Sequence, residues 1–254
     1  MGSGEDLNTT VRRRRAERRG AAIVRAVGCR PDAELRGGTL RLGQRRVGLA
    51  SPHLAADLGE VSPARARGVA DSLGLLVCHS DLDLHRELAP SEPLERVVFD
   101  LLEQLRCESL RPTAWVGMEH NLDAAFGEWS EQCLGERIAE SGVGLLVFTV
   151  THMARTRLIR SLTTEMIDEV TEGQRFALAP LIGEDLAALR GNRHDQRAFA
   201  FHARAIAEAV ALVAGDANLA VAGEGGDRSK LLMSGWDEDE DGASLMGVLG
   251  ATSA

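Results

Sequence analysis

The stretch that decides the fold is His79–Leu110, which reads HSDLDLHRELAPSEPLERVVFDLLEQLRCESL. Its second half repeats apolar residues at spacings of three and four, and they are Leu94, Val97, Val98, Leu101, Leu102 and Leu105. This spacing predicts a helix with one side turned toward a core. Pro90 and Pro93 bracket the turn before it, and we expect Ser91 to cap the helix.

The rest of the chain predicts more helices of the same kind. Only 4% of the 254 residues are aromatic and Tyr is absent, which favours helices packed through aliphatic side chains. The predicted helices cover residues 9–27, 64–78, 94–110, 116–129, 142–162, a short one from 163, 180–189 and 193–214. The predicted fold class is therefore mainly α, a multi-helix bundle with at most a short β-hairpin near residues 38–49.

Three segments follow from this pattern. Residues 1–50 combine an Arg-rich N-terminal helix with the possible hairpin, residues 51–215 form a helical core domain, and residues 216–254 form an acidic tail or linker. The first eight residues are small and polar, and we expect no structure there. The tail contains Gly223–Gly226 and the acidic run Asp237–Asp241, which offer too little apolar area to offset the entropy of ordering.

Charge is divided unevenly along the chain. Residues 1–46 carry 12 Arg against 5 acids, whereas the whole chain has a formal charge of −9. An acidic body does not suit binding to nucleic acid, because affinity for phosphates needs clustered cations. The block Arg12–Arg15 with Arg18 and Arg19 has two interpretations, a solvated helix face or an arm for an acidic partner. The first is the more common outcome.

The four cysteines are Cys29, Cys78, Cys107 and Cys133, and none stands in a Cys-x-x-Cys pair. We expect buried free thiols. Neither a signal peptide nor a run of about 18 apolar residues appears, so the sequence predicts no membrane span and a cytoplasmic protein.

A metal site could be imagined where His79 and His85 flank Asp81 and Asp83. The two histidines are six residues apart, however, and ligands on one helical face would be three or four apart. We expect instead a helix junction in which Asp81 or Asp83 accepts backbone N–H bonds. The sequence therefore predicts no metal-binding residue.

Other chemistry finds no support in the sequence. The Gly-rich stretches lack the Lys-Ser or Lys-Thr of a phosphate loop, and no nucleophile is paired with a base, so no catalytic residue and no bound cofactor are expected. Glu103 and Arg106 are spaced for an intrahelical ion pair worth about 0.3 kcal/mol. Asp195 is expected to cap the last helix, beside His194 and Arg197.

Three stretches carry a resemblance to a known family: His79–Leu110, Met118–Leu122 and Asp195–Ala200. Together they resemble the N-terminal helical region of the CobT-type subunit of aerobic cobaltochelatase. That family joins its helical region, through an acidic linker, to a von Willebrand A domain with an Asp-x-Ser-x-Ser metal-binding motif. Asp227-Arg228-Ser229-Lys230 lacks the second Ser, so we expect no such domain here.

The resemblance implies an accessory, non-catalytic role in cobalamin biosynthesis. The family subunit works with a AAA+ ATPase subunit and a large chelatase subunit, which handle ATP, the corrin ring and cobalt. Candidate partner-contact residues implied by the matching stretches are Asp100, Glu103, Arg106, Asn121, Asp195 and Gln196. The competing hypothesis is a standalone helical scaffold or regulatory adaptor that binds other proteins.

Overall fold

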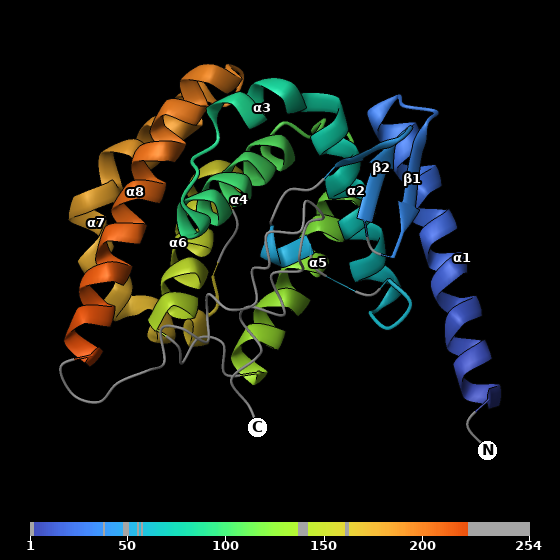
Figure 1. Cartoon of the computed structure of the whole chain (residues 1–254), viewed down its shortest axis with the longest axis horizontal. Coiled ribbons are helices and arrows are strands. Elements are labelled where there is room, and N and C mark those ends of the chain that lie inside the picture. Colours follow the sequence, from blue (N-terminus) through green and yellow to red (C-terminus); the bar gives the residue numbers. More distant parts are fainter. Residues whose placement is uncertain are drawn as a thin grey trace.

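The computed structural model describes residues 3–37, 39–47, 51–54, 56, 58–136, 142–160 and 163–222. Its helices are α1 Ser3–Gly28, α2 Pro63–His79, α3 Leu82–Leu88, α4 Pro93–Ser109, α5 Val116–Gly135, α6 Gly142–Ile159, α7 Glu165–Asn192 and α8 Gln196–Ala222, with the 3₁₀ helix η1 at Pro52–Leu54. The strands are β1 Ala33–Arg36, β2 Thr39–Leu42 and β3 Arg45–Val47. The mainly α prediction is confirmed (Figure 1).

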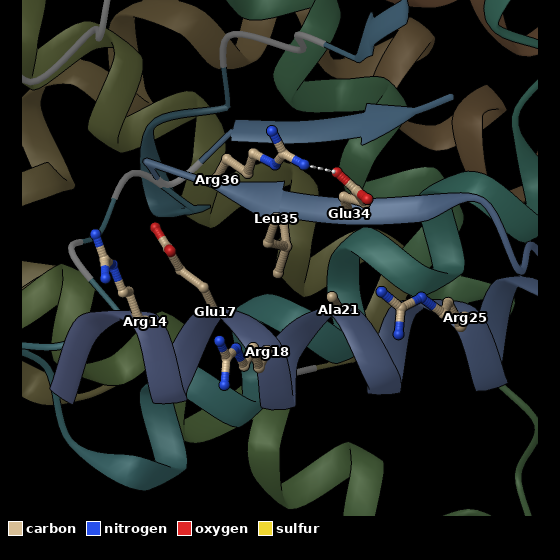
Figure 2. A pocket seen from close by; sticks show the side chains of 8 residues that line it. All are labelled: Arg14, Glu17, Arg18, Ala21, Arg25, Glu34, Leu35 and Arg36. Atoms are coloured by element: carbon tan, nitrogen blue, oxygen red, sulfur yellow. Dashed lines mark ion pairs between the residues drawn. The ribbon is translucent and has the colours of Figure 1, made fainter. Parts of the chain in front are cut away.

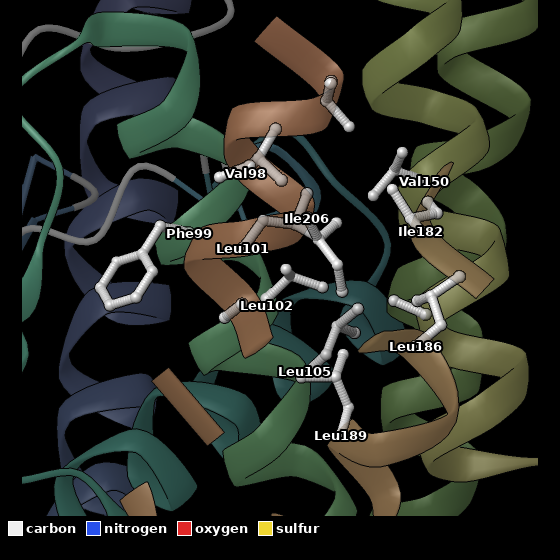
Figure 3. Packing of buried hydrophobic residues seen from close by; sticks show 14 of the residues in the cluster. Val98, Phe99, Leu101, Leu102, Leu105, Val150, Ile182, Leu186, Leu189 and Ile206 are labelled. Atoms are coloured by element: carbon white, nitrogen blue, oxygen red, sulfur yellow. The ribbon is translucent and has the colours of Figure 1, made fainter. Parts of the chain in front are cut away.

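The larger core lies where α4 meets α6, α7 and α8. Leu101, Leu102 and Leu105 of α4 are at most 1% exposed, and they face Ile206 of α8 and Ile182 of α7 (Figure 3). The three-and-four spacing of the α4 leucines therefore does what the sequence predicts, because it turns one apolar side of the helix inward.

A second, smaller core joins α1, the sheet, α2 and part of α5. Val24 of α1 and Leu40 of β2 are buried there, beside Leu75 and Leu76 of α2. The helices approach closely at Gly68 of α2, where an added Cβ would lie 2.0 Å from the Asn121 carbonyl oxygen. Only glycine fits that crossing. In Figure 1 this core lies at the α1 end and the larger core at the α7–α8 end.

The sheet contains the predicted hairpin and one strand more. β2 and β3 pair antiparallel, with Leu40 opposite Val47, within the predicted range 38–49. β1 adds to the other side of β2, with Leu35 opposite Leu40. Ala33 and Leu35 point inward, but two alternating apolar residues are too short a signal to predict a strand.

Helix boundaries depart from prediction at both ends of the chain. α1 begins at Ser3, although residues 1–8 were expected to lack structure, because extending a formed helix costs less than starting one. α8 begins at Gln196 rather than near residue 193. The tail from residue 223 lies outside the described residues.

Pro180 does not separate two helices. α7 runs through it without a break, so the prediction of a short helix followed by another at 180–189 is wrong. Proline removes the hydrogen bond to the carbonyl of Phe176, and both residues are exposed on the outer side of α7. Water can hydrate that carbonyl, which lowers the cost of keeping the helix continuous.

Two smaller predictions also need correction. Glu92, and not Ser91, caps α4, because its carboxylate accepts from the backbone N–H groups of Leu94 and Glu95. Cys29 and Cys78 are exposed, while Cys107 and Cys133 are buried as expected. Helical periodicity alone does not say which end of a helix reaches the surface.

Candidate functional site

The candidate site is a set of buried charged side chains on α4. Asp100, Glu103, Arg106 and Glu108 are each at most 3% exposed. Burial of a charge is costly unless the group is paired and hydrogen-bonded. The hydrogen-bond and ion-pair partners of these four residues therefore show which parts of the fold the site connects.

Glu103 and Arg106 form a two-pronged ion pair. Arg106 Nε and Nη2 donate to the two carboxylate oxygens at 2.7 and 2.8 Å. The same guanidinium donates to the carbonyls of His79 at 2.8 Å and Arg193 at 3.0 Å. Ser80 Oγ donates to Glu103 Oε1 at 2.6 Å. The pair thus joins the end of α2 to the turn between α7 and α8.

Gln196 adds further bonds at the same junction. Its amide oxygen accepts from the Asp81 backbone N–H at 2.8 Å, and its Nε2 donates to the Asp81 carbonyl at 3.0 Å. Asp81 itself caps α3 by accepting from Asp83 and Leu84, which confirms the predicted helix junction. A two-way amide bond of this kind fixes the start of α8 beside the start of α3.

Asp100 holds a second part of the network. Its Oδ1 lies 2.6 Å from His85 Nε2 and accepts from Arg96 Nε at 3.1 Å. The His85 ring stacks on Phe99, with centroids 4.8 Å apart. His85 therefore ties α3 to α4.

Glu108 carries the network across to η1, α2 and α6. Its carboxylate lies 3.0 Å from His53 Nε2, and it accepts from Ser72 Oγ at 2.5 Å and from Arg155 Nη1 at 3.1 Å. Burial by itself raises the pKa of Glu108, but the neighbouring His53 and Arg155 outweigh it, so the pKa lies below its ordinary value. Glu108 is thus held as a carboxylate inside the protein.

A cavity of about 460 Å³ lies at the far end of this network. Arg155 borders it, donating to Asp123 at 2.7 Å and covering the Phe126 ring at 4.2 Å. The other lining residues come from α5, α6, the connection after α6 and the start of α7: Glu119, Gly127, Ser130, His152, Thr156, Ile159, Arg160, Thr163, Thr164 and Ile167. Its lining mixes charged and hydroxyl side chains with two isoleucines and the rings of Phe126 and His152.

His152 is neutral in this cavity. Burial, with a smaller contribution from the Arg155 charge, lowers the pKa of His152 to about 4. Ser130 Oγ donates to the Phe126 carbonyl at 2.9 Å and lies 3.2 Å from His152 Nε2.

The six candidate contact residues divide into two groups. Asp100, Glu103 and Arg106 are buried and bond to other parts of the chain, and contact with a partner there is untested. The Glu103–Arg106 spacing was read correctly, but the pair is not the weak exposed bridge that was expected. Asn121, Asp195 and Gln196 are half-buried or exposed.

Those three side chains have identifiable roles within the fold. Asn121 Nδ2 donates to Asp71 at 2.8 Å, which holds α5 to α2. Asp195 accepts from the Ala198 backbone N–H at 3.0 Å, as expected of a helix cap. Contact with a partner at these positions stays a prediction.

Sequence reasoning missed His53, Ser72, His152 and Arg155. Glu108, the partner of His53, Ser72 and Arg155, is distant from all three in the sequence. Polar residues within the apolar pattern of α6, His152 and Arg155 among them, were the available signal. Among the described residues, no three His, Cys, Asp or Glu side chains gather closely enough to hold a metal ion.

A different feature marks the outer side of α8. Phe201 is 72% exposed and Leu212 is 67% exposed, and Phe176 on the adjoining α7 is 85% exposed. Residues Gln196–Gly215 are long and apolar enough to cross a membrane by composition alone, yet the inner side of the same helix packs in the larger core. The apolar side chains on the outer side of α8 do not contribute to the core, so packing of the core does not explain them.

Comparison with known proteins identifies the family. The sequence model described as cobalamin biosynthesis protein CobT matches residues 18–231. The chain belongs to the CobT family. No curated protein and no solved structure matches it. The matched range contains the whole of the α4 network and both cores, so the fold described above is the body of a CobT-family region.

Proposed function

We propose that the chain is an accessory, non-catalytic subunit of aerobic cobaltochelatase, acting in the cytoplasm. In this role it binds a AAA+ ATPase subunit and the large chelatase subunit, and it supports insertion of cobalt into a corrin ring. Cobalt and ATP are substrates handled by those partners. The observation that carries the proposal is the family match over residues 18–231.

The geometry of α4 supports a coupling role. The larger core lies on one side of the helix, and its buried charges reach α2, α3, α6 and the α7–α8 turn on the others. A helix bonded in this way resists sliding between its neighbours, because each displacement would expose an unpaired buried charge. Force applied by a partner at one end is thereby passed to the other end.

The outer face of α8 supports partner binding. Exposed Phe201 and Leu212 offer apolar area that a protein partner would cover with a gain in free energy. We propose that this face contacts the AAA+ subunit. The same face is the feature that favours the second candidate, a standalone adaptor for unrelated proteins.

Cobalt insertion into hydrogenobyrinic acid a,c-diamide tests the role directly. The assay would contain the large subunit, the AAA+ subunit, ATP and Co(II), with or without this chain, and would follow the corrin absorbance. We expect insertion to need the chain, and the chain alone to insert no cobalt. Insertion by the chain alone would contradict the non-catalytic role, and an unchanged rate on its addition would favour the adaptor.

A surface variant separates the two candidates further. Phe201→Ser should weaken binding to the AAA+ subunit by about tenfold, which corresponds to about 1.4 kcal/mol. Val11→Ser is the matched control, since Val11 is 62% exposed on α1 at the opposite end of the fold. Equal binding by both variants would exclude the α8 face as the contact.

A further inference from the structure

A groove of about 560 Å³ lies between α1 and β1. Its lining residues are Arg14, Glu17, Arg18, Ala21 and Arg25 from α1 and Glu34, Leu35 and Arg36 from β1 (Figure 2). The groove lies in the smaller core's part of the fold, away from the α4 network. Nothing in the proposed chelatase role uses it.

The groove has a surplus of positive charge. Four of its residues are arginines and two are glutamates. Glu34 forms an ion pair with Arg36, with 2.8 Å between Glu34 Oε2 and Arg36 Nη2. Arg25 Nε donates to the Ala33 carbonyl at 2.8 Å. Among the described residues, Arg14 and Arg18 have no hydrogen-bond or ion-pair partner. The guanidinium groups of these two arginines are therefore available to bind an anionic ligand.

One carboxylate already lies in the groove. Glu17 Oε1 accepts from the Gly37 backbone N–H at 2.7 Å, where Gly37 has a φ of 57°. Figure 2 shows the Glu17 side chain pointing from α1 toward the strand beside Arg14. The space between helix and strand thus accepts a carboxylate, and its rim offers two unpaired guanidinium groups to further ones.

We infer that the groove binds the acidic stretch Asp237-Glu238-Asp239-Glu240-Asp241 of the same chain. Residues 1–46 hold 12 Arg and 5 acids, and this stretch is a run of five consecutive acids. An exposed ion pair is worth little alone, but several guanidinium–carboxylate pairs in one groove form a network. The contact is accordingly sensitive to salt.

The length of chain permits the contact. Asp237 follows the last residue of α8, Ala222, by 15 residues. A chain of that length spans up to roughly 50 Å when extended. A compact domain of about 220 residues has a radius of gyration of roughly 17 Å, so its diameter is of the same order as that reach. Because α1 and α8 lie at opposite ends of the fold, only a nearly extended connection would bring the stretch to the groove.

Zero-length carbodiimide cross-linking of the full chain tests the inference. Lys230 is the only lysine, so Arg18→Lys places one new amine in the groove. We expect mass spectrometry to find the amine introduced at position 18 joined to residues 237–241, with a yield that falls severalfold between 20 mM and 1 M NaCl. Adding Arg14→Gln to this variant should lower the yield at least threefold, because it removes half of the unpaired charge.

Controls make the result decisive. Arg157→Lys places an amine at an exposed position of α6, outside the groove, and should give no such product. Mixing ¹⁵N-labelled and unlabelled chains tells whether the link lies within one chain. The inference is overturned by the absence of a link from position 18 to the stretch, by an equal yield from the Arg157→Lys variant, or by links that join labelled to unlabelled chains.

Discussion

α1 and α4 are both rich in arginine and glutamate, and they use these residues in opposite ways. On α4, Arg106 is 2% exposed and meets Glu103 together with two backbone carbonyls. On α1, Arg14 and Arg18 are exposed and have no partner among the described residues. The two helices contain the same types of charged residue. They differ in how many hydrogen-bonding groups surround each guanidinium.

This difference teaches where charge carries structure and where it carries binding. A buried, fully bonded arginine is expensive to disturb, because its removal leaves a carboxylate uncompensated in the interior. An exposed one can be removed at little cost to the fold and remains available to an external anion. The charges of α4 thus hold the fold together, whereas the exposed guanidinium groups of α1 are the ones on which the proposed contact with residues 237–241 rests.

The largest expected effect is at Arg106. Arg106→Met should lower the free energy of unfolding by about 3–5 kcal/mol, because Glu103 would stay buried without its partner. Urea unfolding followed by circular dichroism measures this change. A loss below about 1 kcal/mol would mean that the network does not hold α2 to the α7–α8 turn.

The next effect concerns pH. His152 has an ordinary pKa of 6.5 and a pKa of about 4 in the fold, so below pH 6.5 the unfolded chain takes up a proton that the folded chain does not. The contribution of His152 to the free energy of unfolding should therefore be fully present above pH 6.5. It should fall by about 3 kcal/mol as the pH drops toward 4.

His152→Phe should flatten that part of the pH profile of unfolding. Arg14→Met, which changes an exposed side chain on α1, is the control and should leave the profile unchanged. An unaltered slope in the His152→Phe variant would show that another group causes the acid sensitivity.

A smaller effect is expected at Gln196, whose amide makes the two-way bond with the Asp81 backbone. Gln196→Ala should cost about 1 kcal/mol, because the site is half-exposed and water can replace part of the bonding. In the Gln196→Ala variant, the backbone amides of Asp81 and Leu82 should exchange hydrogen faster than in the unchanged protein. The amides of α2 should be affected less. Exchange unchanged at Asp81 would argue that the bond is not maintained in solution.

The smallest effect is expected on α1. Arg14→Met should change the free energy of unfolding by no more than about 0.5 kcal/mol, because the side chain is exposed and unpaired. The same urea titration measures it beside Arg106→Met. A loss comparable to that at Arg106 would remove the distinction between the two helices.

Much of the fold could be predicted from the sequence, for reasons visible in particular residues. The apolar spacing of α4, the Pro63 start of α2 and the Asp81 and Asp195 caps are local signals, and they appear as expected. The continuity of α7 through Pro180 could not be predicted, since it depends on which side of the helix meets solvent.

The site was less accessible to prediction. Glu103 and Arg106 were found by spacing, but their burial depends on the carbonyls of His79 and Arg193, which are distant in the sequence. The same is true of Glu108, whose partners His53 and Arg155 lie 55 and 47 residues away. Long-range pairing of this kind leaves no local pattern.

The central claim is that this chain is a coupling subunit that binds a AAA+ chelatase ATPase. The most direct test is to mix the purified chain with that ATPase subunit and ATP and to measure the mass of the species by size-exclusion light scattering. The proposal predicts a stable complex whose mass includes both proteins. Two separate peaks, each with the mass of its free protein, would contradict it.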